Sequence, residues 1–244
     1  MIYIINLLEI YIRKLFLKLN KGYRYYNQKI DFNKILTDNF KENKKFVFIQ
    51  VGANDGISFD DLNELITRRD AEGIVIEPVK EYFDQLSKNY SKNVNIIKVN
   101  KAVHPSKKKV IIFKVSNKSM GKYPNWVKGI ASLNQKHHCK SKIDVEDIVS
   151  EEVDSDKLMN IIVDFKNKAI DYFQTDTEGF DLEVIKMIDF KCIKPKIIKY
   201  ESIHLSKSDK KTATKILNKE DYHTFEIGAD TVAINLKKIK IYWK

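Results

Sequence analysis

A short apolar run ends in a glycine turn in the segment Phe46-Val-Phe-Ile-Gln-Val-Gly-Ala-Asn-Asp-Gly56. The run is made mostly of strand-forming residues, and Asp60-Asp-Leu-Asn-Glu-Leu-Ile66 follows with helical spacing. Strand, glycine turn and helix open a nucleotide-binding βαβ unit, in which the helix start offers unpaired N–H groups to an electronegative ligand. The spacing G-x-x-x-G is neither the dinucleotide fingerprint nor a phosphate-binding P-loop, so a tight structural turn remains the alternative for these residues alone.

The rest of the chain alternates strand and helix patterns. Apolar runs predict further strands at 73–77, 94–99, 109–115, 171–176, 196–201, 222–227 and 231–236, and amphipathic spacing predicts helices at 78–90, 156–168, 181–190 and 207–219. Residues 116–142 look irregular, and residues 143–155 alternate weakly. The pattern predicts an α/β fold with a mostly parallel, doubly wound sheet over residues 46–244, interrupted by an insertion at about 103–170.

Polar residues stand where five of these strands end. They are Gly52 to Gly56, Glu77, Asn100, Asp176-Thr-Glu178-Gly179 and Glu201-Ser-Ile-His204. Ligands of such sheets bind at the carboxyl ends of the strands, and an acid at the end of the second strand is placed to accept hydrogen bonds from a ribose diol. Glu77 alone is equally well explained as a helix-start acid, but five separate helix caps explain the whole set poorly.

Lysine supplies nearly all of the positive charge. The formal net charge is +11, yet arginine occurs only at positions 13, 24, 68 and 69. Arginine is the preferred residue for phosphate and base recognition, so its scarcity favours a solvated lysine-rich surface and no nucleic-acid partner, while an anionic membrane or glycan stays compatible. Cys139 and Cys192 have no disulfide or C-x-x-C pattern, which favours a reducing, cytoplasmic compartment.

Residues 1–22 form the most apolar segment, with apolar residues at helical spacing on one side and charged residues on the other. Glu9, Arg13 and Lys14 interrupt it, so it predicts neither a transmembrane helix nor a signal peptide. Two interpretations stay open: the helix packs on the main domain or a second subunit, or it lies on a membrane surface. Residues 1–45 are therefore expected to be a helical extension with a connector.

Six pieces of the chain, taken in order, resemble the FkbM-type S-adenosylmethionine-dependent methyltransferases. They are Phe48-Ile-Gln-Val-Gly-Ala-Asn-Asp-Gly56, Gly73-Ile-Val-Ile-Glu-Pro78, Val99-Asn-Lys-Ala-Val103, Gly129-Ile-Ala-Ser132, Asp176-Thr-Glu-Gly-Phe-Asp181 with Glu183, and Tyr200-Glu-Ser-Ile-His-Leu205. The resemblance implies the class I methyltransferase fold, a Rossmann-like seven-stranded sheet with an antiparallel last strand. It also implies methyl transfer from S-adenosylmethionine to an oxygen, often that of a sugar or natural-product hydroxyl.

The resemblance also implies roles for individual residues. Gly52, Ala53, Asn54 and Gly56 would pass the methionine part of the cofactor, Glu77 would hold the ribose hydroxyls, Asn100 would lie at the adenine, and Asp176 and Glu178 would line the methyl-transfer site. One position departs from the wider methyltransferase pattern: Gln50 stands where many members carry an acid two residues before the first glycine. Asp55 is an alternative partner for the cofactor's ammonium group.

The chemistry of the reaction selects candidate catalytic residues. A sugar hydroxyl is a poor acid, so a general base or a cation beside it is expected. The candidates are Asp176, Glu178, Glu201 and His204, with Mg²⁺ held by Asp176 and Glu201 as the alternative. A metal at His137-His138-Cys139 is disfavoured because adjacent residues rarely point at one ion.

The sequence therefore predicts an O-methyltransferase, either cytoplasmic or peripheral on a membrane, that acts on a carbohydrate-like or natural-product hydroxyl, and a homo-oligomer is compatible with it. A catalytically inactive, methyltransferase-like binding or scaffold protein is the first rival hypothesis, and retention of Glu77, Asp176 and Glu178 argues against it. A dinucleotide or nucleotide-sugar enzyme is the second, and the single G-x-x-x-G argues against that one.

Overall fold

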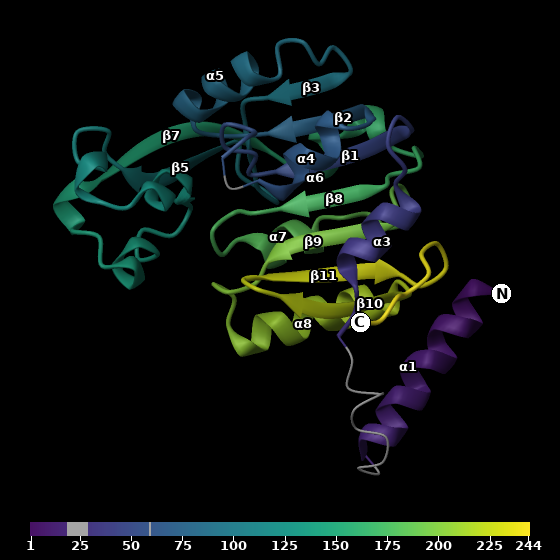
Figure 1. Cartoon of the computed structure of the whole chain (residues 1–244). Coiled ribbons are helices and arrows are strands. Elements are labelled where there is room, and N and C mark those ends of the chain that lie inside the picture. The colour runs from purple at the N-terminus through teal and green to yellow at the C-terminus, as the bar shows by residue number, and fades with distance from the viewer. Residues whose placement is uncertain (19–28, 59) are drawn as a thin grey trace.

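A seven-stranded sheet forms the centre of the protein (Figure 1). The computed structural model describes residues 1–18, 29–58 and 60–244. The sheet has the order β10-β11-β9-β8-β1-β2-β3, with β1 Lys45–Val51, β2 Asp70–Ile76, β3 Ile96–Val99, β8 Tyr172–Thr175, β9 Ile197–Glu201, β10 Tyr222–Ile227 and β11 Asp230–Asn235. β11 runs antiparallel to both of its neighbours, whereas the pairs from β9 across to β3 are parallel. The predicted sheet, with its antiparallel last strand, is confirmed.

Helices cover both faces of the sheet. Successive side chains of a strand point to opposite faces, so Phe46 and Phe48 of β1 pack in one cluster while Val47 and Ile49 pack in the other. The first cluster includes residues of α3 Phe32–Asn39, α4 Asp61–Thr67 and α5 Lys80–Asn89; the second includes residues of α6 Leu158–Ile161, α7 Asp181–Lys186 and α8 Lys207–Lys219. Because β1 is buried on both faces, it reads in the sequence as a continuous apolar run.

The segment between β3 and β8 builds a second, smaller sheet. Its strands β4 Ala102–Val103, β5 Lys109–Val115, β6 Ala131–Ser132 and β7 Ile148–Asp156 lie in the order β4-β7-β5-β6. Short 3-10 turns, η1 Met120–Lys122, η2 Asn125–Gly129, η3 His138–Ser141 and η4 Val145–Asp147, join β5, β6 and β7. The small sheet projects past the carboxyl ends of the parallel strands, on the left of Figure 1. It therefore borders the edge at which a ligand site is expected.

Two predicted helices are shorter than the sequence pattern suggests. Residues 156–168 are predicted as one helix, but they hold the single turn α6 followed by the 3-10 turn η5 Val163–Phe165. The helix predicted at 181–190 ends at Lys186. In both segments Ile, Val and Phe are common, and these residues have only moderate helix propensity. Their apolar spacing follows from packing against the sheet, where Leu158, Ile162 and Phe165 are buried.

Helix α1, Ile2–Lys18, packs by one side on the end of the chain. The side-chain amide of Asn6 donates to the carbonyl oxygens of Leu236 (3.0 Å) and Ile239 (2.7 Å), and the guanidinium of Arg13 lies 4.0 Å from the ring centre of Trp243. Its other side is apolar and exposed. The rest of the predicted 1–22 segment, from residue 19, lies outside the described residues. Among the described helices, none is long and apolar enough to cross a membrane.

Candidate active site

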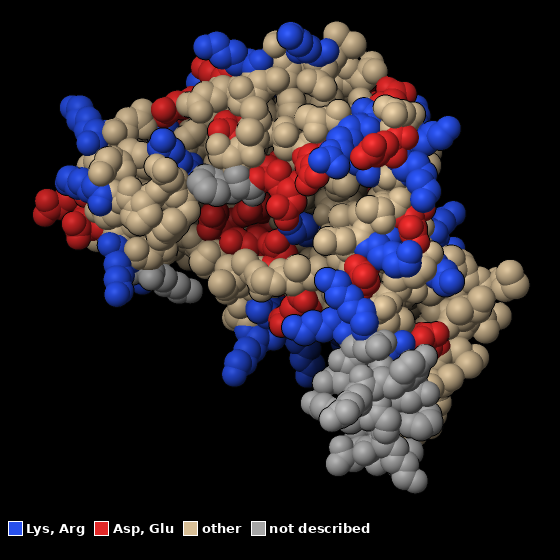
Figure 2. Space-filling model, in the orientation of Figure 1, with Lys and Arg blue, Asp and Glu red and all other residues tan. Residues whose placement is uncertain are grey.

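A cavity of about 500 Å³ opens at the carboxyl ends of the parallel strands, within the usual size range of small-molecule sites. Its acidic lining residues are Asp60, Glu77, Asp176, Glu178 and Glu201. Figure 2 shows acidic side chains gathered in this central hollow, whereas lysine and arginine side chains are spread around it. A basic protein thus carries an acidic cavity, which favours a ligand with positive charge.

The glycine turn after β1 brings the main chain close to the end of β8. Gly52 has φ +77°, and a Cβ atom placed on it would lie 1.8 Å from the carbonyl oxygen of Asp176. The N–H groups of Gly52 and Ala53 both donate to the carbonyl oxygen of Ile76, at 2.9 and 3.1 Å. Glycine is thus required at position 52 by both backbone angle and space, and the turn is fixed between β2 and β8.

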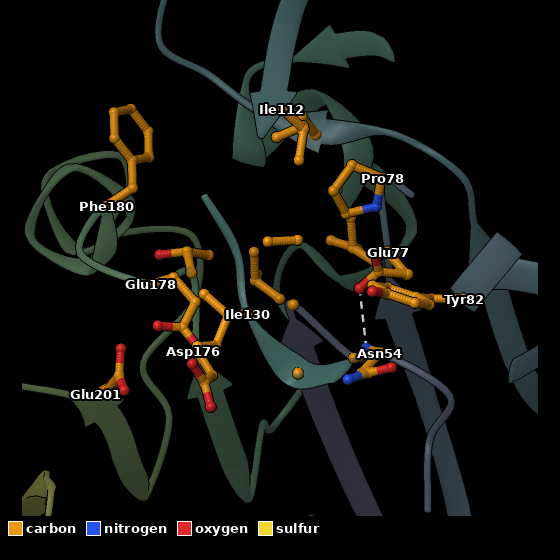
Figure 3. A pocket seen from close by; sticks show the side chains of 18 of the residues that line it. Asn54, Glu77, Pro78, Tyr82, Ile112, Ile130, Asp176, Glu178, Phe180 and Glu201 are labelled. Atoms are coloured by element: carbon orange, nitrogen blue, oxygen red, sulfur yellow. Dashed lines mark hydrogen bonds between the residues drawn. The ribbon is translucent and has the colours of Figure 1, made fainter. Parts of the chain in front are cut away.

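Glu77 follows β2 directly and closes this turn with its side chain. Its Oε2 accepts a hydrogen bond from the N–H of Asn54 (2.9 Å), drawn as a dashed line in Figure 3, and its Oε1 accepts one from the N–H of Val79 (2.9 Å). Burial raises the pKa of Glu77 to about 7, although both hydrogen bonds favour the charged form. Each carboxylate oxygen keeps a second lone pair for a ligand that donates hydrogen bonds.

Asp60 and two glutamines form a polar group in the same cavity. Gln50 of β1 and Gln174 of β8 are cross-strand partners, and their side-chain amides donate to the two oxygens of Asp60, at 2.8 and 3.1 Å. The side-chain carbonyl oxygens of both glutamines are buried and have no hydrogen-bond partner. All three residues line the cavity. A carboxylate beside two unsatisfied acceptors fits a cationic hydrogen-bond donor such as an ammonium group.

The predicted catalytic residues meet at the other end of the cavity. Figure 3 shows Asp176, Glu178 and Glu201 side by side, opposite Glu77. Oxygen atoms of these three carboxylates lie within 4.8 Å of one another. Nε2 of His204 lies 3.5 Å from Oε2 of Glu178 and 3.5 Å from Oε1 of Glu201. The four residues that the sequence selects for chemistry are therefore brought together by the turns after β8 and β9.

Mutual repulsion and burial change how these carboxylates titrate. The pKa of Asp176 lies well above its ordinary value because it sits deep in the protein and close to Asp181 and Glu178, although its own side chain opens into the cavity. The pKa of Glu201 is raised by burial and then by Asp176 and Glu178. Burial and this repulsion both favour the protonated forms of Asp176 and Glu201.

A family model for the Methyltransferase FkbM domain matches residues 50–227. The chain belongs to the FkbM methyltransferase family. Membership confirms the predicted S-adenosylmethionine-dependent methyltransferase, and the sheet order is that of its class I fold. No curated protein matches the sequence.

Several solved structures resemble the FkbM domain at low identity. A crystal structure of Methyltransferase FkbM from Methylobacillus flagellatus KT is 13% identical with a TM-score of 0.47, and the match covers 86% of this chain and 49% of that chain. A precorrin-6y C5,15-methyltransferase from Geobacter metallireducens GS-15 is 12% identical with a TM-score of 0.39, covering 81% and 82% of the two chains. A SAM dependent methyltransferase from Aquifex aeolicus is 10% identical with a TM-score of 0.38, covering 91% and 98%.

The residues of the FkbM domain fit the methyl donor. Its amino-acid part carries an ammonium group, which matches the unsatisfied acceptors of Gln50 and Gln174 beside Asp60. Its ribose carries two hydroxyl donors, which match the remaining lone pairs of Glu77. Of the residues predicted to bind the cofactor, Gly52, Ala53, Asn54 and Glu77 line the cavity.

Three other predicted cofactor residues do not line this cavity, and their contacts explain why. The carboxylate of Asp55 accepts hydrogen bonds from the N–H groups of Ile57 (2.9 Å) and Ser58 (2.7 Å), so it holds its own loop. Gly56 packs against Leu86 of α5 and against Tyr90, the C-cap of that helix, and its carbonyl accepts a hydrogen bond from the Tyr90 hydroxyl at 2.8 Å. The amide of Asn100 donates to the carbonyls of Glu77 (2.8 Å) and Pro78 (3.0 Å), where it fixes the end of β2.

Sequence reasoning misses Asp60, Gln174 and the wall that the insertion supplies. Asp60 accepts from the N–H of Leu62 at 3.0 Å as the N-cap of α4, which is the role its sequence position predicts. Tyr82 of α5 and Ile112, Trp126 and Ile130 of the insertion also line the cavity. The alternation of buried and exposed residues along β5 is typical of a half-buried strand, but such a pattern in a sequence does not show which part of the protein the buried face contacts.

Proposed function

We propose that the protein transfers the methyl group of S-adenosylmethionine to a hydroxyl oxygen of a carbohydrate-like or natural-product acceptor. The observation that carries the proposal is the meeting of Asp176 and Glu201, both with raised pKa values, in the same cavity as the glycine turn. A raised pKa makes the ionised form of a carboxylate a stronger base than an ordinary carboxylate.

In this proposal Glu77 binds the ribose hydroxyls and Asp60, with Gln50 and Gln174, binds the ammonium group of the donor. The donor supplies a methyl group on a positively charged sulfur. Asp176 and Glu201 orient the acceptor hydroxyl beside Glu178, and the ionised form of one of them takes its proton. Trp126 and Phe180, which line the cavity, offer aromatic faces to a ring-shaped acceptor.

The decisive experiment is methyl transfer from labelled S-adenosylmethionine to a panel of glycans and small hydroxylated compounds, with matched amines and thiols as comparison acceptors. We expect labelled methyl ethers and no labelled amine or thioether products. Transfer to nitrogen or sulfur alone would contradict the oxygen assignment.

A calorimetric titration with the donor separates this proposal from a non-catalytic scaffold. A scaffold that has lost the cofactor site shows no binding, whereas the proposal requires saturable binding that Glu77→Gln and Asp60→Asn weaken. Donor binding without transfer to any compound of the panel indicates that the true acceptor is missing from the panel. Absence of both binding and transfer indicates an inactive protein.

A further inference from the structure

Two histidines and a glutamate converge from three separate segments beside the cavity. His137 comes from the insertion, where η3 begins, Glu178 from the turn after β8, and His204 from the turn after β9. Nε2 of His137 lies 2.8 Å from Oε2 of Glu178, and Nε2 of His204 lies 3.5 Å from the same oxygen. One ligand atom from each of the three residues lies within 4.8 Å of the others.

The close contact between His137 and Glu178 is not an aligned hydrogen bond. The two side chains are 5% and 13% exposed, yet neither Nε2 of His137 nor Oε2 of Glu178 makes an aligned hydrogen bond. Buried polar atoms without partners are costly, at about 1–3 kcal/mol each. A cation between the two lone pairs would satisfy both atoms at once.

The spacing suits a transition-metal ion. Bonds of about 2.0–2.1 Å to nitrogen and oxygen place neighbouring ligand atoms about 3 Å apart, between the two separations seen here. The rings of His137 and His204 lie 4.4 Å apart between centres, at an interplanar angle of 73°, so both can turn an edge toward one point. Two imidazoles and one carboxylate suit Zn²⁺ and related divalent ions, whereas Mg²⁺ and Ca²⁺ prefer oxygen ligands alone.

The backbone of Glu178 is held in an unusual conformation. Its φ is +53°, a left-handed conformation that side-chain-bearing residues rarely adopt. The hydroxyl of Ser132 in β6 donates to its carbonyl oxygen at 2.9 Å and holds it there. Ser132 thus ties Glu178 to the same insertion that carries His137.

We propose that His137, Glu178 and His204 bind one divalent transition-metal ion of the Zn²⁺ class. Binding itself does not depend on the proposed function. The catalytic consequence of metal binding does rest on the proposed function. Because His204 and Glu178 line the cavity, a fourth coordination position facing the cavity would take the acceptor hydroxyl and lower the pKa of that hydroxyl. The site differs in its ligands from the Mg²⁺ alternative at Asp176 and Glu201, which it adjoins through Glu178 and through the contact between His204 and Glu201.

The test uses the full-length chain, stripped with a chelator and then titrated with Co²⁺ as a spectroscopic probe and with Zn²⁺ in calorimetry. We expect one equivalent of each ion to bind, with visible Co²⁺ bands typical of a four- or five-coordinate site. Loss of a partner outside the coordination sphere already costs about 10–100-fold in metal affinity, so His204→Gln, which removes a ligand, should weaken binding at least about 100-fold.

Matched variants keep the test decisive. His223→Gln removes a histidine from β10, at the far edge of the sheet, and should leave metal binding unchanged. Because His137 is buried and its replacement risks unfolding, His204→Gln and Glu178→Gln are the primary variants, and thermal unfolding checks that each is folded. The proposal is overturned if no equivalent of Co²⁺ binds, or if binding survives His204→Gln and is lost in Asp176→Asn, which would place the ion among the carboxylates.

Methyl transfer is measured separately on the same samples. One bound equivalent without methyl transfer to any acceptor removes the proposed function and leaves the metal site standing. Methyl transfer by a chain that binds no metal removes the metal site and leaves the function.

Discussion

Replacing Glu77 tests the cofactor site and the turn that supports it in one series. Two backbone N–H groups, those of Asn54 and Val79, donate to its carboxylate at 2.9 Å each. Glu77→Ala leaves both without an acceptor, at about 1–3 kcal/mol for each, so we expect the free energy of unfolding to fall by about 2–6 kcal/mol. Glu77→Gln keeps one acceptor oxygen, and about half of that loss is expected.

The effect on the cofactor is measured in the variant that stays folded. Loss of charge-assisted hydrogen bonds to the ribose hydroxyls costs about 1–3 kcal/mol, which corresponds to about 5- to 150-fold weaker binding. Calorimetry with S-adenosylmethionine on Glu77→Gln gives the affinity, and urea unfolding gives the stability. Ser87→Ala on α5, at a position that does not line the cavity, is a control that should change neither.

The pH dependence supplies an internal check. Because the pKa of Glu77 is raised to about 7, its carboxylate ionises between about pH 6 and 8, and donor affinity should rise over that interval. The rise should be smaller in Glu77→Gln, which cannot ionise. Unchanged affinity and an unchanged pH profile in a folded Glu77→Gln protein would refute the assignment of this residue to the ribose.

Four further outcomes are expected. Asp176→Asn should lower turnover about 10²-fold or more while donor affinity changes little, and a near-normal rate on the true acceptor would move the chemistry to Glu178, Glu201 or His204. Gly52→Ala should abolish donor binding, measured by calorimetry, because its Cβ would meet the Asp176 carbonyl oxygen at 1.8 Å. The free protein should lose stability as pH rises from about 5 to 8 in thermal unfolding scans, because carboxyl groups with raised pKa values bind more protons in the folded than in the unfolded state. We also propose that the exposed apolar face of α1 lies on anionic membranes. The chain should co-sediment with anionic vesicles, and the double variant Leu8→Ser with Tyr11→Ser should not. If the unmutated chain stays in the supernatant, a second protein is the better candidate for covering this face.

The sheet can be predicted because parallel strands buried on both faces leave a strong mark in a sequence. β1 reads as a nearly continuous apolar run that stops at the glycine turn, and the shorter β9 ends at Glu201. The same logic places Glu77, Asp176 and Glu201 at one edge of the sheet from the sequence alone. What position cannot show is the local partner: the end of a strand suggests that Glu77 can be replaced freely, whereas its two hydrogen bonds to the turn say otherwise.

The pairing of Gln50 with Gln174 shows where sequence reasoning stops. These residues are far apart in the chain and become neighbours only through the register between β1 and β8. Gln50 departs from the usual acid, and Asp55 is the nearest replacement along the sequence. The structure offers Asp60 instead, since it receives hydrogen bonds from both glutamines while it caps α4. A helix cap and a ligand carboxylate look identical in a sequence.

The histidine pair is hard to interpret for the same reason. His137 and His138 are adjacent, and the sequence disfavours a metal held by these neighbours; the side chain of Cys139 lies outside the described residues. That expectation does not extend to His137 alone, with ligands from other segments. Its partners Glu178 and His204 follow β8 and β9, and only the fold of the insertion brings His137 to them.

The net charge of the chain does not predict the charge of the cavity either. A total of +11 describes a lysine-rich surface, yet the cavity is lined by five carboxylates against Lys101 and His204. Low-dielectric walls concentrate the field of those carboxylates inside the cavity, while solvent screens the lysines outside. Burial, and after it the same field, raises the pKa values of Asp176 and Glu201, and the field attracts a positively charged ligand. A donor with a cationic sulfur and a divalent ion beside it would each relieve that repulsion, but the two cations also repel one another and draw on the same field. One equivalent of Zn²⁺ should therefore weaken donor binding. Calorimetric titration of the donor with and without one equivalent of Zn²⁺ measures that coupling directly, and its sign shows whether relief of the carboxylate repulsion or repulsion between the two cations prevails.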